Sequence, residues 1–293
     1  TDANKKWLRT STANNNTTNV LYAQYSANTY TVKYASGNAN CTLSTTTYAT
    51  HTATYDTEFN KANPTCSGYT FNGWTLTGGN TGTAKYGTSS GNATTAWVDG
   101  NKGTYFKNLT DTSGATVTMT AAFLENVYEI QNSGGTVTGY ADSLTNALSA
   151  VAANGTIKAL KNNSSAAVTN SKNIKFDLNG KTVTLTGILT NNASLDIYSS
   201  ANGRTITANL GRLITNAGTL TINGTSSSYT TTLVNTSSAT GTYVVVNNAS
   251  KPMTVNAKAE LKFSNAIVQG DTAGYRYVVY AGGVFTLQGG TIT

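Results

Sequence analysis

LITNAGTLTINGT, residues 213 to 225, decides the fold of the second half of the chain. Two short runs rich in aliphatic and β-branched residues flank the tight-turn sequence NAG. In the second run, TLTIN, polar and apolar residues alternate, which is typical of a strand with one buried face. The segment therefore predicts a short strand, a tight turn and a second strand.

Three further segments share this pattern: ILTNNASLDIYSS (188–200), VVVNNASKPMTVNAK (244–258) and VVYAGGVFTLQGG (278–290). Together, the four segments begin at residues 188, 213, 244 and 278, so the repeat is about 25 residues, with longer loops inserted in some turns. Strands that stack on their equivalents one repeat away bury a column of Leu, Ile and Val. This pattern predicts a right-handed parallel β-helix over residues 126–293.

Asparagines occupy matching turn positions in three of these segments: Asn191, Asn216 and Asn247. Buried polar groups require hydrogen-bond partners, and stacked amides can provide them for each other and for turn carbonyls. We therefore expect these side chains to form a hydrogen-bonded ladder.

One helix is expected, at the start of the second half. SLTNALSAV (143–151) places its apolar residues on one helical stripe. Asp142 or Ser143 can cap the start of this helix, and Gly155 can end it. Because the exposed first repeat of a solenoid needs a cap, we expect the helix, over residues 142–154, to provide that cap.

The first half contains an internal repeat. NVLYAQYSANTYTV (19–32) matches VTMTAAFLENVYEI (117–130) at an offset of 98 residues. Residues 1–27 are therefore expected to be the tail of one unit, and residues 28–125 the next complete unit. At the other end, no polar cap follows FTLQGGTIT (285–293), which predicts further coils in a longer parent protein.

Several motifs carry a family resemblance. YTVKY (30–34), GYTFNGW (68–74) and VTMTAAF (117–123) resemble the Listeria–Bacteroides repeat, the InlB B-repeat family of bacterial surface proteins. The resemblance implies a small β-grasp-like domain strung in tandem on secreted or wall-attached proteins. The polar insertion at 78–100 and the cysteine pair depart from the family pattern. NIKFDLNGKTVTLTG (173–187) is similar to the pectin-lyase-like β-helices of bacterial surface proteins.

Aromatic residues in GYTFNGW are expected to form a core. Tyr69 and Phe71 share one face of a strand, and Gly73 permits a bend that re-aims Trp74. A domain of this size needs large side chains inside, which favours a core over a glycan-stacking platform. Trp97, in the polar insertion, is the better candidate for an exposed aromatic that contacts a glycan.

The two cysteines, Cys41 and Cys66, lie in polar, turn-like segments and form no CxxC or Cys/His metal spacing. A disulfide between them is favoured, and two separate buried thiols are the alternative. His51 is the only histidine, so any His-based metal site or Ser-His-Asp triad would depend on it alone. No metal or cofactor is expected.

Composition narrows the class of protein. Charged residues make up only 11% of the chain, while Thr, Tyr and Val favour strands, so the chain should be almost all-β. The net charge of +7 is spread along the sequence, which disfavours nucleic-acid binding and allows a weak attraction to acidic glycans or anionic cell walls. No apolar run reaches the length of a membrane span. TDANKKWLRT, at the start, is no signal peptide, so either a signal was removed or the chain is a fragment.

Acidic residues are sparse in the second half, and Asp177 and Asp196 are the only pair expected on neighbouring coils. Glycosidic hydrolysis generally needs two facing carboxylates. A turn role for Asp177 and a solvated strand position for Asp196 are favoured instead, so no enzyme is expected. Thr-rich strands at 182–186, 219–221 and 291–293 raise an ice-binding hypothesis, which the irregular repeat length disfavours.

These patterns predict a non-enzymatic, extracellular bacterial protein fragment, an adhesin-like stalk or scaffold. Its expected partners are a glycan or a protein on a host or neighbouring cell, together with further repeats of the same parent chain. Two alternatives remain open: a structural subunit of a surface layer or filament, and a polysaccharide-active β-helix enzyme.

Overall fold

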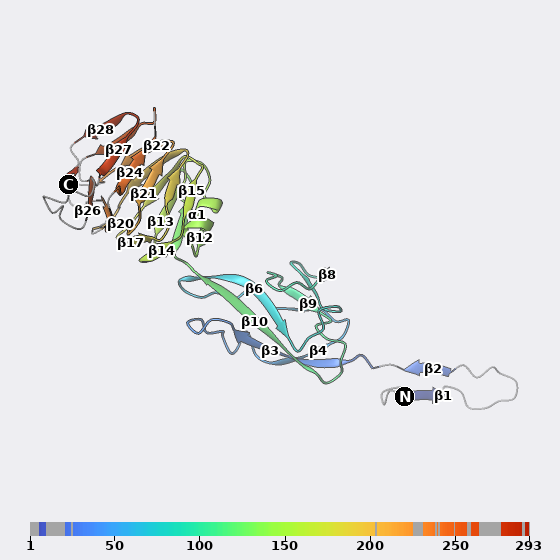
Figure 1. Ribbon diagram of the computed structural model, residues 1–293. Helices are drawn as coiled ribbons and strands as arrows, with labels where there is room; N and C mark the ends of the chain where they lie inside the picture. The colour runs from blue at the N-terminus through green and yellow to red at the C-terminus, as the bar shows by residue number, and fades with distance from the viewer. Residues whose placement is uncertain are drawn as a thin grey trace, which may run out of the picture. The chain divides into compact units, whose positions relative to one another are not determined.

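The computed structural model describes residues 6–9, 21–24, 26–202, 204–224, 231–237, 239, 241–248, 250–256, 259–263, 277–288 and 291–292. These residues form 29 strands and one helix (Figure 1), which confirms the predicted mainly β composition. The chain divides into two compact units, Thr1–Leu124 (unit 1) and Glu125–Thr293 (unit 2). Most of the tail predicted at residues 1–27 lies outside the described residues.

The main sheet of unit 1 has the order β4-β3-β10-β6. Its strands are β3 (Thr29–Ser36), β4 (His51–Thr54), β6 (Tyr69–Thr77) and β10 (Thr116–Glu125). β3 pairs with β10 in parallel and with β4 in antiparallel orientation, and Figure 1 shows β3, β10 and β6 side by side. Along β10 the sequence TVTMTAAF alternates, and every second side chain is buried: Val117, Met119, Ala121 and Phe123.

A second sheet of unit 1 is small and antiparallel, with the order β5-β9-β7-β8. Its strands are β5 (Phe59–Asn60), β7 (Lys85–Gly87), β8 (Thr95–Ala96) and β9 (Tyr105–Lys107). The polar stretch 78–100, expected as an insertion, thus provides two strands of this sheet. A separate antiparallel pair consists of β1 (Lys6–Arg9) and β2 (Leu21–Gln24).

Unit 2 contains three sheets that receive strands in turn. The first continues from β13 (Thr156–Ala159) through β16 (Ile174–Asp177), β19 (Ser194–Tyr198), β22 (Thr219–Ile222), β25 (Met253–Asn256) and β28 (Phe285–Gln288). The second contains β14 (Asn163–Ser165), β17 (Thr182–Leu185), β20 (Arg204–Ala208), β23 (Thr231–Asn235), β26 (Ala259–Phe263) and β29 (Thr291–Ile292). The third contains β15 (Val168–Asn170), β18 (Leu189–Asn191), β21 (Arg212–Asn216), β24 (Tyr243–Asn247) and β27 (Tyr277–Ala281). Every third strand therefore returns to the same sheet, and we call one such set a three-strand repeat.

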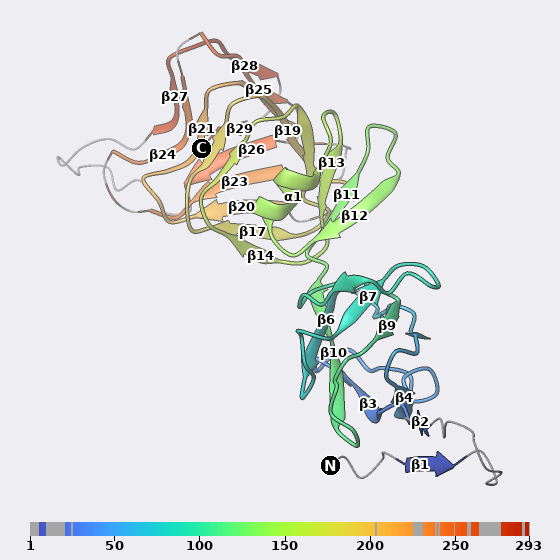
Figure 2. The same ribbon diagram turned by 90° about the vertical axis from the view of Figure 1, so that its right-hand side faces the viewer.

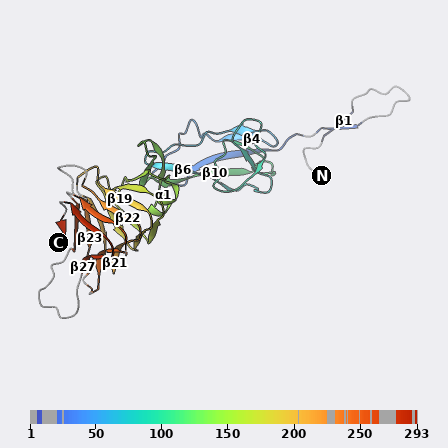
Figure 3. The same ribbon diagram turned by 90° about the horizontal axis from the view of Figure 1, so that it is seen from above.

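Successive repeats pair in parallel, and their apolar residues are in register. Figure 2 shows β14, β17, β20, β23 and β26 following one another across one sheet, and Figure 3 shows the colours of unit 2 changing from green to red through the repeats. Inward side chains stack from strand to strand in columns such as Phe176–Ile197–Ile222–Val255, Val183–Ile206–Leu233–Leu261 and Leu189–Ile214–Val245. The four segments identified from sequence each supply two strands. Of the second sheet, the Thr-rich stretches at 182–186 and 291–293 contain β17 and β29, whereas β14, β20, β23 and β26 were not predicted.

Unit 2 starts with a hairpin and a short helix. β11 (Tyr128–Gln131) and β12 (Val137–Ala141) pair in antiparallel orientation, and β11 continues the first sheet beside β13. The helix α1 (Leu144–Ala150) packs against β11, β12 and β15. It begins as predicted, since the side chain of Ser143 accepts the backbone N–H of Asn146. It ends earlier than predicted, at Ala150, because Val151 is extended and buried.

Among the described residues, no helix is both long and apolar enough to cross a membrane.

Candidate functional site

The structure brings the three predicted asparagines together in one row. Asn191, Asn216 and Asn247 end β18, β21 and β24, and their side chains are fully buried. Nδ2 of Asn191 donates to Oδ1 of Asn216 at 2.8 Å, and Nδ2 of Asn216 donates to Oδ1 of Asn247 at 2.6 Å. The same amides donate to backbone carbonyls in the turns that follow them: Ala193, Gly218 and Lys251. The row therefore satisfies turn carbonyls as well as its own members.

The row has a fourth member that was missed from sequence. Asn170 ends β15, is buried, and donates from Nδ2 to Oδ1 of Asn191 at 2.8 Å. The signal was present, because VTN at 168–170 matches LTN at 189–191 and ITN at 214–216. It was overlooked because the second strand of this first repeat, IKFD at 174–177, follows a turn without the NAS or NAG sequence.

A disulfide joins Cys41 to Cys66, the pair favoured from sequence, with their Cα atoms 5.6 Å apart. Cys41 is buried in the core of unit 1, and Cys66 is half-buried against it. Beside the bond, Nδ2 of Asn40 donates to the hydroxyl of Tyr69 at 2.9 Å. The disulfide therefore fastens the loop after β3 to the start of β6.

Trp74 lies at the centre of the unit 1 core, with no exposed surface. Its ring centroid lies 5.3 Å from that of Phe71 and 6.4 Å from that of Phe106. Tyr69 and Phe71 are half-buried and pack against the same core. The bend expected at Gly73 is present: its φ is +108°, and a Cβ there would lie 2.2 Å from the carbonyl oxygen of Gly100. These aromatics therefore hold the domain together.

Trp97 corrects a prediction from sequence. Expected as an exposed glycan contact, it is only 5% exposed, and its Nε1 donates to Oδ1 of Asp99 at 2.9 Å. Its ring lies 5.9 Å from Phe106, because β7 and β8 fold the polar stretch back onto the core. Trp97 therefore belongs to the core, and the structure does not offer it as a binding platform.

Both candidate acids of unit 2 accept hydrogen bonds from neighbouring residues of the same unit. Asp177 is 3% exposed; its Oδ1 accepts the backbone N–H groups of Asn179 and Ser200, and its Oδ2 accepts the Ser200 hydroxyl. Asp196 accepts from the side chain of Asn223. Burial raises the pKa of Asp196, while the Asn223 hydrogen bond and the charge of Lys175 act in the opposite direction. Asp177 is the last residue of β16, and its carboxylate accepts from the turn that follows, a structural role like the one favoured from sequence. Asp196 is partly buried instead of freely solvated.

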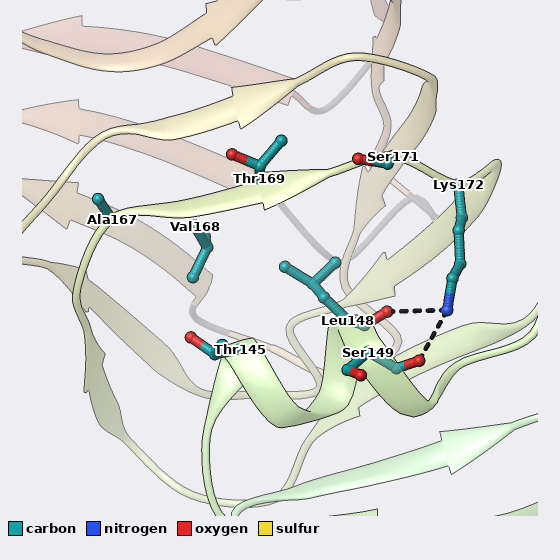
Figure 4. A pocket seen from close by; sticks show the side chains of 8 residues that line it. All are labelled: Thr145, Leu148, Ser149, Ala167, Val168, Thr169, Ser171 and Lys172. Atoms are coloured by element: carbon teal, nitrogen blue, oxygen red, sulfur yellow. Dashed lines mark hydrogen bonds between the residues drawn. The ribbon is translucent and has the colours of Figure 1, made fainter.

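A pocket of about 400 Å³ lies between α1 and β15 (Figure 4). Leu148 and Val168 provide its apolar part, and hydroxyl groups of Thr145, Ser149 and Thr169 lie around them. At one end, Nζ of Lys172 donates to three backbone carbonyls: Leu148 at 3.2 Å, Ser149 at 2.7 Å and Val151 at 2.7 Å. The ammonium group therefore caps the helix C-terminus, where cations are favoured.

A second pocket, of about 460 Å³, lies on unit 1 and is lined by His51, Glu58, Phe59, Asn60, Lys61, Ser90 and Tyr105. Burial, and then the charge of Lys61, lowers the pKa of His51. Nδ1 of His51 has no hydrogen-bond partner among the described residues. The histidine is packed against Tyr34 and Phe59, with ring centroids 5.9 and 4.9 Å away. His51 therefore packs beside the aromatic core of unit 1, where its surroundings disfavour the charged form.

In the described part of the chain, no three His, Cys, Asp or Glu side chains are grouped so that they could hold a metal ion. Comparison with protein-family models, with curated proteins and with solved structures finds no match to this chain.

Proposed function

We propose that the chain is a non-enzymatic scaffold from a secreted or cell-surface bacterial protein, an adhesin-like stalk. In this proposal residues 126–293 are a right-handed parallel β-helix, with α1 and the β11–β12 hairpin at its first repeat. Residues 28–125 are a β-grasp-like repeat of the Listeria–Bacteroides type, of which other copies occur in the parent protein. Its partners are glycans or proteins on the surface of a host or neighbouring cell.

One observation carries the proposal: the buried row of Asn170, Asn191, Asn216 and Asn247, which runs through four consecutive three-strand repeats. Each repeat satisfies its polar groups through the next one, and aliphatic columns run beside the row. A core of this kind grows by adding repeats, without a larger globular interior. That property suits a protein whose task is to present a surface.

Two further observations support a location outside the cytoplasm and a role without catalysis. The disulfide between Cys41 and Cys66 is typical of oxidising compartments. The carboxylate of Asp177 is held by three hydrogen bonds, from the turn that follows β16 and from Ser200 after β19, a structural use of that group.

Surface labelling tests the location. An antibody raised against the chain should bind intact, unpermeabilised cells that carry the gene, and brief protease treatment of those cells should abolish the signal. Labelling that appears only after permeabilisation would contradict the proposal. The catalytic alternative is tested by incubating the chain with acidic and neutral polysaccharides. We expect no new reducing ends and no unsaturated products, and their release would support the enzyme instead.

A further inference from the structure

We propose that the outer face of the small sheet β5-β9-β7-β8 binds an acidic saccharide. Lys85 and Lys107 hold its carboxylate or sulfate group, and Tyr105 contacts the sugar ring. The site lies wholly within unit 1 and does not depend on the scaffold role of unit 2.

The small sheet places two lysines opposite each other. Lys85 of β7 and Lys107 of β9 are direct cross-strand partners. Like charges directly opposite each other on a sheet are destabilising. Both side chains are half-buried, so solvent screens their repulsion less than it would at a fully exposed position. An anion placed between the two ammonium groups relieves this repulsion.

The neighbouring acid, Glu58, is held by backbone N–H groups and, among the described residues, forms no ion pair with these lysines. Glu58 directly precedes Phe59, whose partner Phe106 directly precedes Lys107. Instead of pairing with Lys107, the two carboxylate oxygens of Glu58 accept backbone N–H groups of Gly91 at 2.7 Å and Ala93 at 2.9 Å. Within the described residues, neither Lys85 nor Lys107 has a carboxylate within ion-pair distance. The lysine pair is therefore left without a counter-ion from this part of the chain.

An aromatic ring, that of Tyr105, lies on the same strand as Lys107. Tyr105 lies two residues before Lys107, so both project from the same face of β9, while Phe106 points into the core. The cross-strand partners of Tyr105 are Asn60 and Gly87, and Gly87 places no side chain beside the ring. Tyr105 and Asn60 also line the 460 Å³ pocket together with Ser90. A ring face, an amide and a hydroxyl are the groups that contact the C–H faces and hydroxyls of a sugar.

A saccharide fits this surface better than a nucleic acid does. Binding of a nucleic-acid backbone needs a basic stripe along several phosphates, with several aromatic rings for stacking bases. The face offers one pair of lysines and one half-buried tyrosine. That arrangement matches a single anionic group attached to a ring.

The experiment uses the whole 293-residue chain. Its binding to polygalacturonate, dextran sulfate, neutral dextran and single-stranded DNA is measured by biolayer interferometry. We expect binding to at least one acidic polysaccharide, weakened when NaCl rises from about 50 to about 300 mM, because salt screens exposed charges. Preference for polygalacturonate would assign a carboxylate ligand, and preference for dextran sulfate a sulfate ligand.

Matched variants locate the site. The double variant Lys85→Gln/Lys107→Gln should weaken binding about tenfold, the combined effect of two partly exposed charge contacts. Tyr105→Thr, which removes the ring but keeps a residue that favours strands, should weaken it about as much. The control Lys33→Gln/Lys102→Gln removes the same charge from exposed positions elsewhere in unit 1 and should change binding less than about twofold. Tryptophan fluorescence verifies that each variant is folded.

Three results would overturn the site: no binding to either acidic polysaccharide, equal effects of the Lys85/Lys107 and Lys33/Lys102 variants, or tighter binding to DNA or neutral dextran. None of these results bears on surface labelling of intact cells, so failure of the site and failure of the scaffold proposal remain distinguishable.

Discussion

The two units have cores of different kinds. Unit 1 surrounds one tryptophan, Trp74, with rings from several strands and fastens its loops with the Cys41–Cys66 disulfide. Unit 2 has no such centre in its described part: beyond Tyr128 and Phe176 its buried core is aliphatic, and four of its buried asparagines form a row of amides. The core of unit 1 is closed around its largest residues, whereas a core like that of unit 2 can be extended by stacking further repeats.

This difference shows how composition is matched to architecture. A small closed domain buries a modest share of its surface, so each aromatic ring and each covalent link matters. A stacked array gains about the same apolar contact from every added layer, so no single layer needs a large residue. The buried tryptophans Trp74 and Trp97 accordingly both lie in the core of unit 1. Their fluorescence therefore reports unfolding of unit 1 alone.

The largest expected effect comes from opening the closed core. Trp97→Ala removes a nearly buried ring that contacts Tyr86 and Phe106, and it should lower the free energy of unfolding of unit 1 by about 4 kcal/mol. Urea unfolding followed by the fluorescence of the remaining tryptophans measures this loss. Val98→Ala, at a 55% exposed neighbour, is the control and should cost less than about 0.5 kcal/mol. Equal effects at both positions would mean that Trp97 is no core residue.

Removing the covalent link should have the next largest effect. Cys41→Ser/Cys66→Ser opens a loop with a sequence separation of 25 residues, which corresponds to about 3.5 kcal/mol of stability in unit 1. The wild-type chain with and without a reducing agent gives the same comparison without a substitution. An unchanged urea midpoint in both experiments would contradict the stabilising role.

Breaking the amide row tests the open core of unit 2. Asn216→Ala removes the Nδ2 donor to Oδ1 of Asn247 and to the Gly218 carbonyl, and it removes the Oδ1 acceptor of the Asn191 amide. Unsatisfied buried groups cost about 1–3 kcal/mol each, and local relaxation should limit the total to about 3 kcal/mol. Hydrogen-exchange mass spectrometry should show faster exchange in β18, β21 and β24.

The control for that substitution is Asn192→Ala, at an exposed position next to the row. It should leave exchange unchanged. If Asn192→Ala and Asn216→Ala gave the same exchange pattern, the row would not be what holds the repeats in register.

The smallest expected effect is the pH dependence of unit 1. The pKa of His51 is lowered in the folded state by burial and by Lys61, so below pH about 6.5 the unfolded chain binds the proton more readily. The stability that unit 1 gains from keeping His51 neutral is therefore fully present above pH about 6.5. It is lost as the pH falls below that value. His51→Phe should flatten the change in urea midpoint between pH about 7.5 and about 5.5. A wild-type midpoint that rises on acidification would contradict this sign.

Periodic features were predictable because their cause is local in the sequence. Alternation in TLTIN and the matched Asn191, Asn216 and Asn247 specify the strands and the row, since equivalent positions must stack. Asn170 was not predicted as a member of the row, because its segment was not aligned with the other repeats. The strands β20 and β23 were not predicted for a different reason: they lie in segments dominated by Thr and Ser, which resemble loops in composition.

The location of Trp97 was not predictable from its neighbours. The stretch 78–100 is polar throughout, and only the pairing of β7 with β9 carries it back onto Phe106. The lysine–tyrosine face also depends on that pairing, because Lys85 and Lys107 are 22 positions apart in the sequence. Cross-strand partners that are distant along the chain leave no local pattern.

Lys172 has a consequence for the order in which unit 2 is built during synthesis. A helix of seven residues is too short to persist alone in water, and the carbonyls at its C-terminal end gain their partner only from an ammonium group about twenty residues further along. The C-terminal end of the helix is therefore capped only after the later segment that contains Lys172 has left the ribosome. A peptide of residues 142–155 should accordingly give a coil spectrum by circular dichroism, while one that extends through the second repeat should not.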